Sequence, residues 1–129
     1  MEFSRFVSPI HREVLKKVRD TYGNTAQILV SVEELNELSC VCAKFPRYED
    51  PDRARKELHN KAVDEVADVL IVLDHIINIF DLTPADIGNR IEAKVARMKR
   101  WLNVSTSQSQ TMVDRKVEFN HQTSLFEKE

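Results

Sequence analysis

The segment from Ala62 to Leu73 constrains the fold of this chain more than any other. Every residue in it is apolar except Asp64, Glu65 and Asp68. A helix that is apolar on nearly all of its faces is expected to lie in the middle of a helical bundle. Glu65 and Asp68 lie one turn apart on one face, and burial of these carboxylates is costly unless a cation neutralises them. The sequence therefore predicts a buried helix that carries a cation site.

A second acidic cluster, Glu33-Glu34-x-x-Glu37, lies on a separate predicted helix. Residues 38–64, between the two clusters, are just enough chain to fold one helix back against the other. Three like charges within one turn repel one another unless something neutralises them. We therefore expect the five carboxylates to face one another around a shared cation.

The helix of this second cluster allows two interpretations of its faces. At about 100° per residue, Ile28, Val32 and Leu35 mark a predicted core face roughly opposite the acids. An acidic face opposite an apolar face is also typical of a solvated surface stripe. Val30 and Val41, however, lie within the acidic sector, where a solvated face is usually polar. Together with the acids of the 62–73 segment, this pattern favours the cation site.

Helix-breaking residues predict four helices. The 129 residues contain only two glycines and four prolines, and no run alternates as a strand would, so the fold class is all-α. Four helices with short links suggest a four-helix bundle. We expect a first helix that is capped by Ser8-Pro9 and closed by Gly23, and a second that starts at Asn24 or Thr25 and stops before Pro46. A third helix should run from the loop at residues 45–51, which contains two prolines, to about Phe80. A fourth should open at Thr83-Pro84-Ala85-Asp86 and run through Trp101.

The chain changes character near residue 104. We expect a helical domain over residues 1–103 and a polar tail over residues 104–129, because 105–111 are almost wholly Ser, Thr and Gln. A weakly ordered tail is one interpretation. The alternative is that its few apolar side chains dock on a partner subunit.

Composition and charge exclude several classes of function. With 42% hydrophobic and 31% charged residues the chain resembles an ordinary soluble globular domain, and a net charge of -2 gives no reason to expect nucleic acid as a partner. Cys40 and Cys42 point about 200° apart on one helix and predict neither a disulfide nor a zinc site. No apolar run is long enough for a membrane span or a signal peptide, so the expected location is cytoplasmic.

Carboxylates without histidine or cysteine suit a magnesium site. Mg²⁺ prefers oxygen ligands in near-octahedral geometry and keeps positions open for water and phosphate oxygens, and Mn²⁺ is a possible substitute. A polyphosphate is anionic and cannot approach five carboxylates without an intervening divalent cation. The acids therefore indicate Mg²⁺-assisted phosphoryl transfer.

At these residues the sequence resembles the all-alpha nucleoside triphosphate pyrophosphohydrolases, the MazG-like superfamily, including its short phage-associated members. The resemblance lies in two motifs, E-L-x-E-L at residues 34–38 and E-V-A-D-V-L at residues 65–70, and in their spacing on neighbouring helices. It covers roughly residues 20–102 and leaves the tail outside.

The resemblance implies a hydrolase that cleaves a (deoxy)nucleotide between its alpha and beta phosphates, releasing a nucleoside monophosphate and pyrophosphate. It implies Mg²⁺ held by Glu34, Glu37, Glu65 and Asp68. Glu33 would be either a further ligand or the group that orients the attacking water. The family also implies a homo-oligomer, either a homodimer or a dimer of dimers, that clears unwanted nucleotides.

Four residues are candidates for contact with the nucleotide. Lys94 and Arg97 have the K-x-x-R spacing of the family's basic element, although basic residues near a helix C-terminus are usually solvated. Lys61, one turn before Glu65, is a weaker candidate for a phosphate. Gln27, two turns before Glu34, is placed either to bind a nucleobase edge or to pack between helices.

Other classes of function explain the acids less well. The main alternative is a non-enzymatic helical interaction module with an acidic docking face, which predicts no affinity for divalent metal. A ferritin-like di-iron protein needs a Glu-x-x-His motif on each of two helices, and the one such motif here, Glu118 to His121, lies in the tail. A DNA-binding protein is disfavoured because the chain lacks a helix-turn-helix signal.

Overall fold

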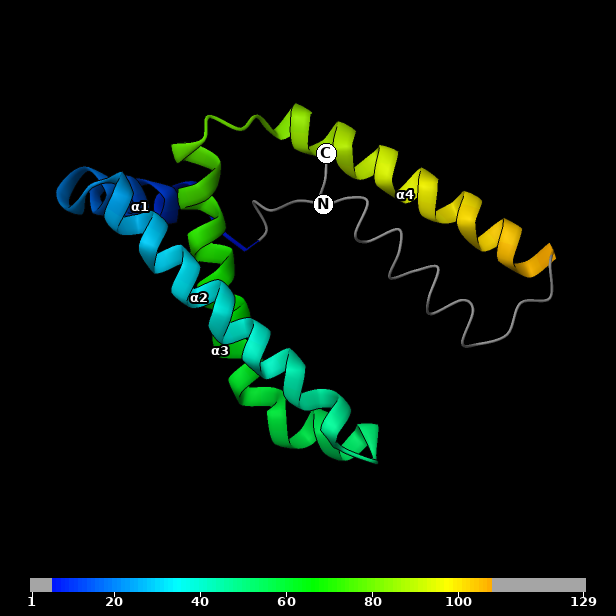
Figure 1. Ribbon diagram of the computed structural model, residues 1–129. Coiled ribbons are helices and arrows are strands. Elements are labelled where there is room, and N and C mark those ends of the chain that lie inside the picture. Colours follow the sequence, from blue (N-terminus) through cyan, green and yellow to red (C-terminus); the bar gives the residue numbers. More distant parts are fainter. Residues whose placement is uncertain (1–5, 108–129) are drawn as a thin grey trace. The chain divides into compact units, whose positions relative to one another are not determined.

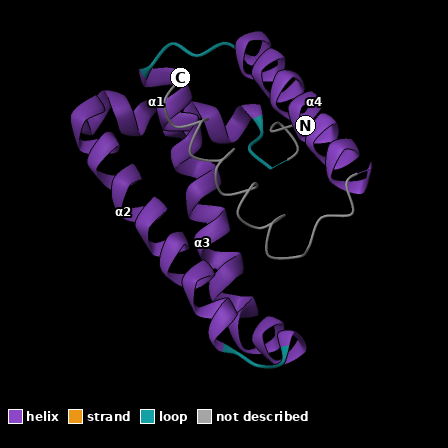
Figure 2. Cartoon of the chain, turned by 45° about the vertical axis from the view of Figure 1, so that its right-hand side comes forward, coloured by secondary structure: helices purple, strands orange, loops and turns teal. Residues whose placement is uncertain are grey.

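The computed structural model describes residues 6–107 of the chain and, within that range, contains helices and no strand. Figure 1 shows the helices, and Figure 2 shows the same elements from a second side. The predicted all-α class is confirmed. The elements are α1 (Pro9–Tyr22), α2 (Asn24–Lys44), the short 3-10 helix η2 (Phe45–Arg47), α3 (Pro51–Ile79) and α4 (Pro84–Ser107).

Helix α1 begins and ends where the local chemistry predicts. The Ser8 side chain accepts a hydrogen bond from the His11 backbone N–H at 3.3 Å, and His11 Nδ1 accepts one from the Ser8 N–H at 3.2 Å, which completes a capping box. Gly23 closes the helix with φ +90°, a conformation that side chains rarely adopt, and its N–H donates to the carbonyl of Arg19. Because α2 starts at the next residue, α1 and α2 are joined without a loop.

Helices α2 and α3 run side by side as an antiparallel pair, with η2 at their connection (Figure 1). Asp50 caps α3 by accepting a hydrogen bond from the Asp52 backbone N–H at 3.0 Å, and Pro51 occupies the first turn. Ala54 and Val41 are buried between the two helices near this connection. The pair is the framework on which the acidic residues lie.

The predicted core face of α2 is wrong. Val32 is 53% exposed and Leu35 is 42% exposed, whereas the buried residues of α2 are Gln27, Ser31 and Val41. The buried side of α2 is the side that also carries Glu34, and it is this side that lies against α3. The side of α2 that packs against α3 therefore carries polar as well as apolar residues, and apolar periodicity did not identify it.

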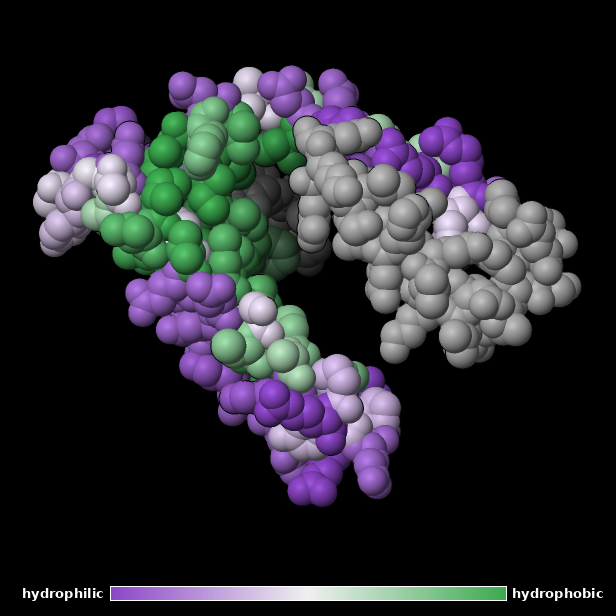
Figure 3. All heavy atoms as spheres, in the orientation of Figure 1, coloured by the Kyte–Doolittle hydropathy of each residue, from purple (hydrophilic) through white to green (hydrophobic). Residues whose placement is uncertain are grey.

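Helix α3 is buried on one side rather than on nearly all sides. Val69 and Val72 are buried, but Val63 and Ile71 are 54% and 41% exposed. Among residues 6–83, α3 packs against α1, α2 and the short η2, which leave part of its apolar surface uncovered. Figure 3 shows a concentration of apolar side chains over the C-terminal half of α3.

A buried ionic network fastens α1 to α3. The Arg19 guanidinium contacts Asp74 Oδ2 at 3.2 Å and His75 Nδ1 at 3.0 Å, and Arg12 approaches Asp74 Oδ1 at 3.6 Å. Since arginine only donates hydrogen bonds, Nδ1 is the acceptor and the ring is neutral. Burial, with repulsion from Arg19, lowers the pKa of His75, while Asp74 opposes this shift. This network with α1 was not predicted from the sequence.

Helix α4 belongs to a second compact unit, separate from the unit that contains α1 to α3. The prediction that it ends at Trp101 is wrong, because the helix continues to Ser107. Residues 102–107 contain no glycine or proline, so no strong stop signal follows the tryptophan. The rest of the predicted tail, residues 108–129, lies outside the described residues, and packing of α4 into a four-helix bundle stays a prediction.

Within residues 6–107, none of the helices combines the length and apolar character that crossing a bilayer requires. Cys40 and Cys42 are both exposed and free.

Replacing Asp74 tests the importance of the ionic network. The Arg19 side chain is only 10% exposed and would lose its counter-charge in Asp74→Ala, which costs about 3 kcal/mol for a buried pair. Arg12→Ala should cost less than about 1 kcal/mol, because the Arg12 side chain is 44% exposed. Urea unfolding followed by circular dichroism measures both. Asp64→Ala, at an exposed position of the same helix, is the control, and equal losses in all three variants would contradict the network's role.

Candidate metal centre

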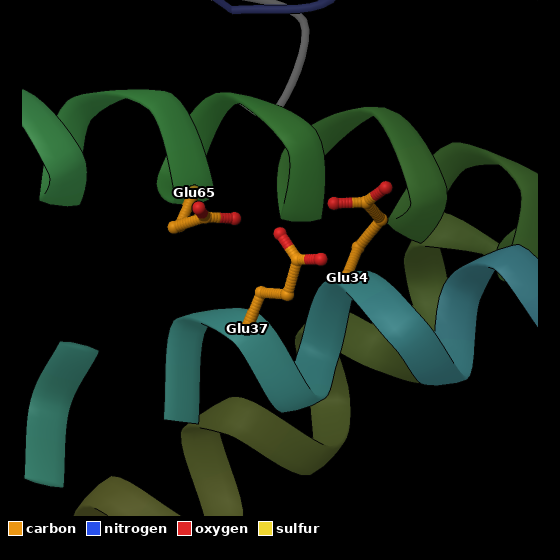
Figure 4. Close-up of side chains that lie close together, drawn as sticks. All are labelled: Glu34, Glu37 and Glu65. Carbon is orange, nitrogen blue, oxygen red and sulfur yellow. The ribbon is translucent and has the colours of Figure 1, made fainter. Parts of the chain in front are cut away.

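Three carboxylates converge across the α2–α3 pair. Glu34 and Glu37 project from successive turns of α2, and Glu65 projects from the facing side of α3 (Figure 4). One oxygen from each lies within 4.8 Å of the other two. The two motifs are therefore brought together as the sequence predicted, and we call these three residues the carboxylate trio.

The other two predicted acids lie at the edge of the trio. Asp68, one turn after Glu65, is half-buried, and its negative charge contributes to raising the pKa of Glu34. Glu33 is exposed and also raises the pKa of its neighbours Glu34 and Glu37. Both groups are close enough to act on the trio electrostatically, although neither belongs to the set of mutually close oxygens.

Loss of solvation and mutual repulsion raise the pKa values of Glu34 and Glu37 on α2. Loss of solvation is the largest cause for Glu34, followed by the charges of Asp68 and Glu37. For Glu37 the largest cause is the Glu65 carboxylate, and Lys61 opposes the shift. Protonated Glu37 can also donate a hydrogen bond to Glu65, so a proton relieves part of the repulsion. A divalent cation would relieve more of it, because it carries two charges and reaches all three groups.

Glu65 is the least exposed member of the trio, at 1% relative exposure. Its Oε1 pairs with Lys61 Nζ at 2.5 Å, whereas its Oε2 is buried without a hydrogen-bond partner. A buried carboxylate oxygen that lacks a donor is costly. The ion pair with Glu65 raises the pKa of Lys61, and the structure thus places this lysine on the trio itself.

An open groove adjoins the trio along α2. The basic and polar groups that line it include Lys44, Lys61 and Asn36, beside the acids Glu33 and Glu37. Its apolar lining is formed by Leu29, Val32 and Val41. Asn36 was not among the residues expected at the site; its position one residue before Glu37 and three after Glu33 could have suggested it, since i and i+3 share a helix face.

The residues present fit a hard divalent cation. Two oxygens bound to one Mg²⁺ are about 3 to 4 Å apart, since each lies about 2.1 Å from the ion. Oxygens within 4.8 Å of one another therefore need only small side-chain rotations to share an ion. The orphaned Oε2 of Glu65 offers a ligand atom that no protein donor uses. All donors are carboxylates, which matches Mg²⁺ or Mn²⁺ rather than zinc.

The remaining candidates for nucleotide contact lie in different environments. Gln27 is 7% exposed, which favours packing between helices over contact with a base. Lys94 and Arg97 are half-buried on α4, in the second unit, and their contact with phosphate stays a prediction.

The raised pKa of Glu37 makes its ionisation unfavourable for folding. The folded state holds this proton more tightly than the unfolded chain, whose value is 4.5. The penalty therefore builds up as pH rises above 4.5 and is complete above the raised pKa. In metal-free buffer we expect Glu37→Gln to raise the melting temperature at pH 7 and to have little effect at pH 4. Calorimetry with chelator, with Glu13→Gln on α1 as the control, measures this, and a larger gain at pH 4 than at pH 7 would contradict it.

No family model, curated protein or solved structure matches the chain. The description of the site therefore depends on the positions of its side chains and on the chemistry of carboxylates. The resemblance to the MazG-like superfamily stays an expectation from two short motifs.

Proposed function

We propose that this chain is a Mg²⁺-dependent nucleoside triphosphate pyrophosphohydrolase of the MazG-like type. It would cleave the bond between the alpha and beta phosphates of a (deoxy)nucleotide, which clears that nucleotide from the pool. One observation carries the proposal: the buried carboxylate of Glu65 faces Glu34 and Glu37 with one oxygen unpartnered. A buried carboxylate is tolerated when it is paired or coordinates a metal ion. The two acidic motifs also resemble those of this superfamily.

The residues have distinct roles in this proposal. Glu34, Glu37 and Glu65 would hold the cation, with Asp68 as the fourth expected ligand. Bound Mg²⁺ supplies positive charge that stabilises the phosphoryl oxygens and brings the anionic substrate to the acids. Glu33 is exposed beside the groove and is the carboxylate best placed to orient water and accept its proton.

The groove beside the trio provides room and charge for the substrate. Lys44 and Lys61 line it, so two ammonium groups lie on the side of the trio from which a polyphosphate can approach. Asn36 offers an amide that can donate to phosphate or sugar oxygens. The apolar residues of the same groove are suited to the face of a base.

Self-association is part of the proposal, because the unit exposes a large apolar surface. A mostly apolar groove between α1 and α3 is lined by residues that include Phe6, Val14 and Ile71, each more than 40% exposed. Exposed apolar patches of this kind mark interaction sites. We propose a second copy of the chain as the occupant, since a two-fold axis would set this face against itself and cover α3.

A docking module is the second candidate function. Val32 and Leu35 are exposed on α2 beside the exposed acids Glu33 and Glu37, a mixture that a basic, apolar partner could bind. This candidate requires no metal. Absence of any Mg²⁺ or Mn²⁺ binding by the folded chain would favour it over the hydrolase.

Replacing Glu65 tests the hydrolase. Glu65→Gln keeps the shape of the side chain but removes its charge, so we expect Mg²⁺-dependent release of pyrophosphate to fall by about 100-fold or more. The assay separates monophosphate plus pyrophosphate from diphosphate plus phosphate over a panel of standard and deoxy nucleotides. Asp64→Asn changes the exposed neighbour and is the matched control. Wild-type chain that releases no pyrophosphate from any nucleotide would refute the activity.

Replacing Ile71 tests the self-association. A charge placed in the apolar groove by Ile71→Lys must be buried on association, so we expect a mass near the 15.0 kDa of one chain, against a multiple of it for wild type. Light scattering after gel filtration measures both masses. Asn60→Lys adds the same charge to an exposed position of α3 outside the groove and should leave the mass unchanged. A monomeric wild-type chain would refute the assembly.

A further inference from the structure

The ion pair between Lys61 and Glu65 joins a solvent-exposed side chain to a buried one. The two side chains lie one turn apart on α3, with Nζ 2.5 Å from Oε1. The Glu65 side chain is 2% exposed, but the Lys61 side chain is 59% exposed. Glu65 is held between α2 and α3, whereas Lys61 has a flexible four-carbon stem in solvent. Only the cation of this pair is free to leave.

Lys61 neutralises the trio incompletely. It contacts one oxygen of Glu65 and leaves the other, Oε2, without a partner. Its charge also acts on Glu37, where it partly offsets the repulsion from Glu65. One positive charge therefore serves at least two carboxylates. A divalent cation at the same oxygens would supply twice the charge.

Lys61 and a divalent cation compete for the same carboxylate, that of Glu65. Lys61 occupies Oε1 of Glu65, and the Glu65 carboxylate is one of the three whose oxygens lie close together. Two cations held at neighbouring oxygens repel each other. Binding of the metal to Glu65 therefore requires the ammonium group of Lys61 to move away.

The groove offers the displaced ammonium group a second position. Lys61 already lines this groove together with Lys44 and Asn36. An anionic ligand that reaches the metal from this side would meet Lys61 at the moment when it no longer pairs with Glu65. The same charge can thus serve the carboxylates first and the ligand second.

We propose that Lys61 is a displaceable counter-ion, which neutralises Glu65 until a divalent cation binds and then turns to the groove to pair with the phosphates of the ligand. This inference rests on the proposed function and adds to it an order of events. Lys61 opposes binding of the metal alone and favours binding of the metal together with a polyphosphate. The ion pair therefore couples occupancy of the metal site to the presence of substrate.

Two titrations of the full chain test the exchange. Free Mn²⁺, followed by electron paramagnetic resonance, should bind Lys61→Met about three- to tenfold more tightly than wild type, because no ammonium group has to leave. Inorganic pyrophosphate with saturating Mg²⁺, followed by calorimetry, should bind the same variant about three- to tenfold more weakly. Lys61→Gln should repeat both shifts. Lys61→Arg, whose planar group pairs more firmly with a carboxylate, should weaken Mn²⁺ binding.

Lys44→Met distinguishes displacement of the Lys61 ammonium group from the simple loss of one positive charge in the groove. It removes the same charge from the same groove, but among the described residues Lys44 forms no ion pair with Glu65. We expect its Mn²⁺ affinity to change less than twofold. The exchange would be overturned if Mn²⁺ affinity rose equally in Lys44→Met and Lys61→Met, or if it did not rise in Lys61→Met while wild type binds Mn²⁺. Either result would still be compatible with the metal site. Failure of folded wild type to bind Mn²⁺ would instead overturn the proposed function, and the exchange with it.

Discussion

The approach of Glu65 to the glutamates of α2 is the interaction on which the rest of this structure depends. The acids lie on the side of α2 that packs against α3, the side that also buries Gln27, Ser31 and Val41. Repulsion among these carboxylates opposes the packing, as the raised pKa values of Glu34 and Glu37 indicate. Contacts elsewhere in the unit, such as Val41 and Ala54 near the connection, stabilise the pair against this repulsion.

This arrangement leaves apolar side chains exposed on the outer surface. Because the polar side of α2 faces inward, Val32 and Leu35 face outward, where a helix of an isolated domain usually carries polar groups. Helix α3 likewise leaves Val63 and Ile71 uncovered. The exposed residues of α2 follow from the placement of its acids, whereas those of α3 follow from its incomplete covering by neighbouring helices.

Local chemistry made several features predictable from the sequence. Ser8 and Gly23 delimit α1 through a capping box and a positive φ angle, which depend only on neighbouring residues. The meeting of Glu34 and Glu37 with Glu65 followed from two short motifs and a short connection. Apolar periodicity failed for the core face of α2, because it assumes that apolar side chains always face inward. The bond from Arg19 to Asp74 spans 55 positions in the chain, and no local pattern encodes it.

The ionic network at Asp74 has a consequence for how the chain tolerates change at the trio. Asp74 lies nine residues after Glu65 on one continuous helix, about 13 Å along its axis. The contacts of Asp74 with α1 therefore share no residue with the contacts of Glu65, so a side-chain rotation at Lys61 does not break them. Because α3 contacts α1 near its C-terminal end and carries Glu65 about two to three turns earlier, side chains at the trio can rearrange while the packing of α1 is kept.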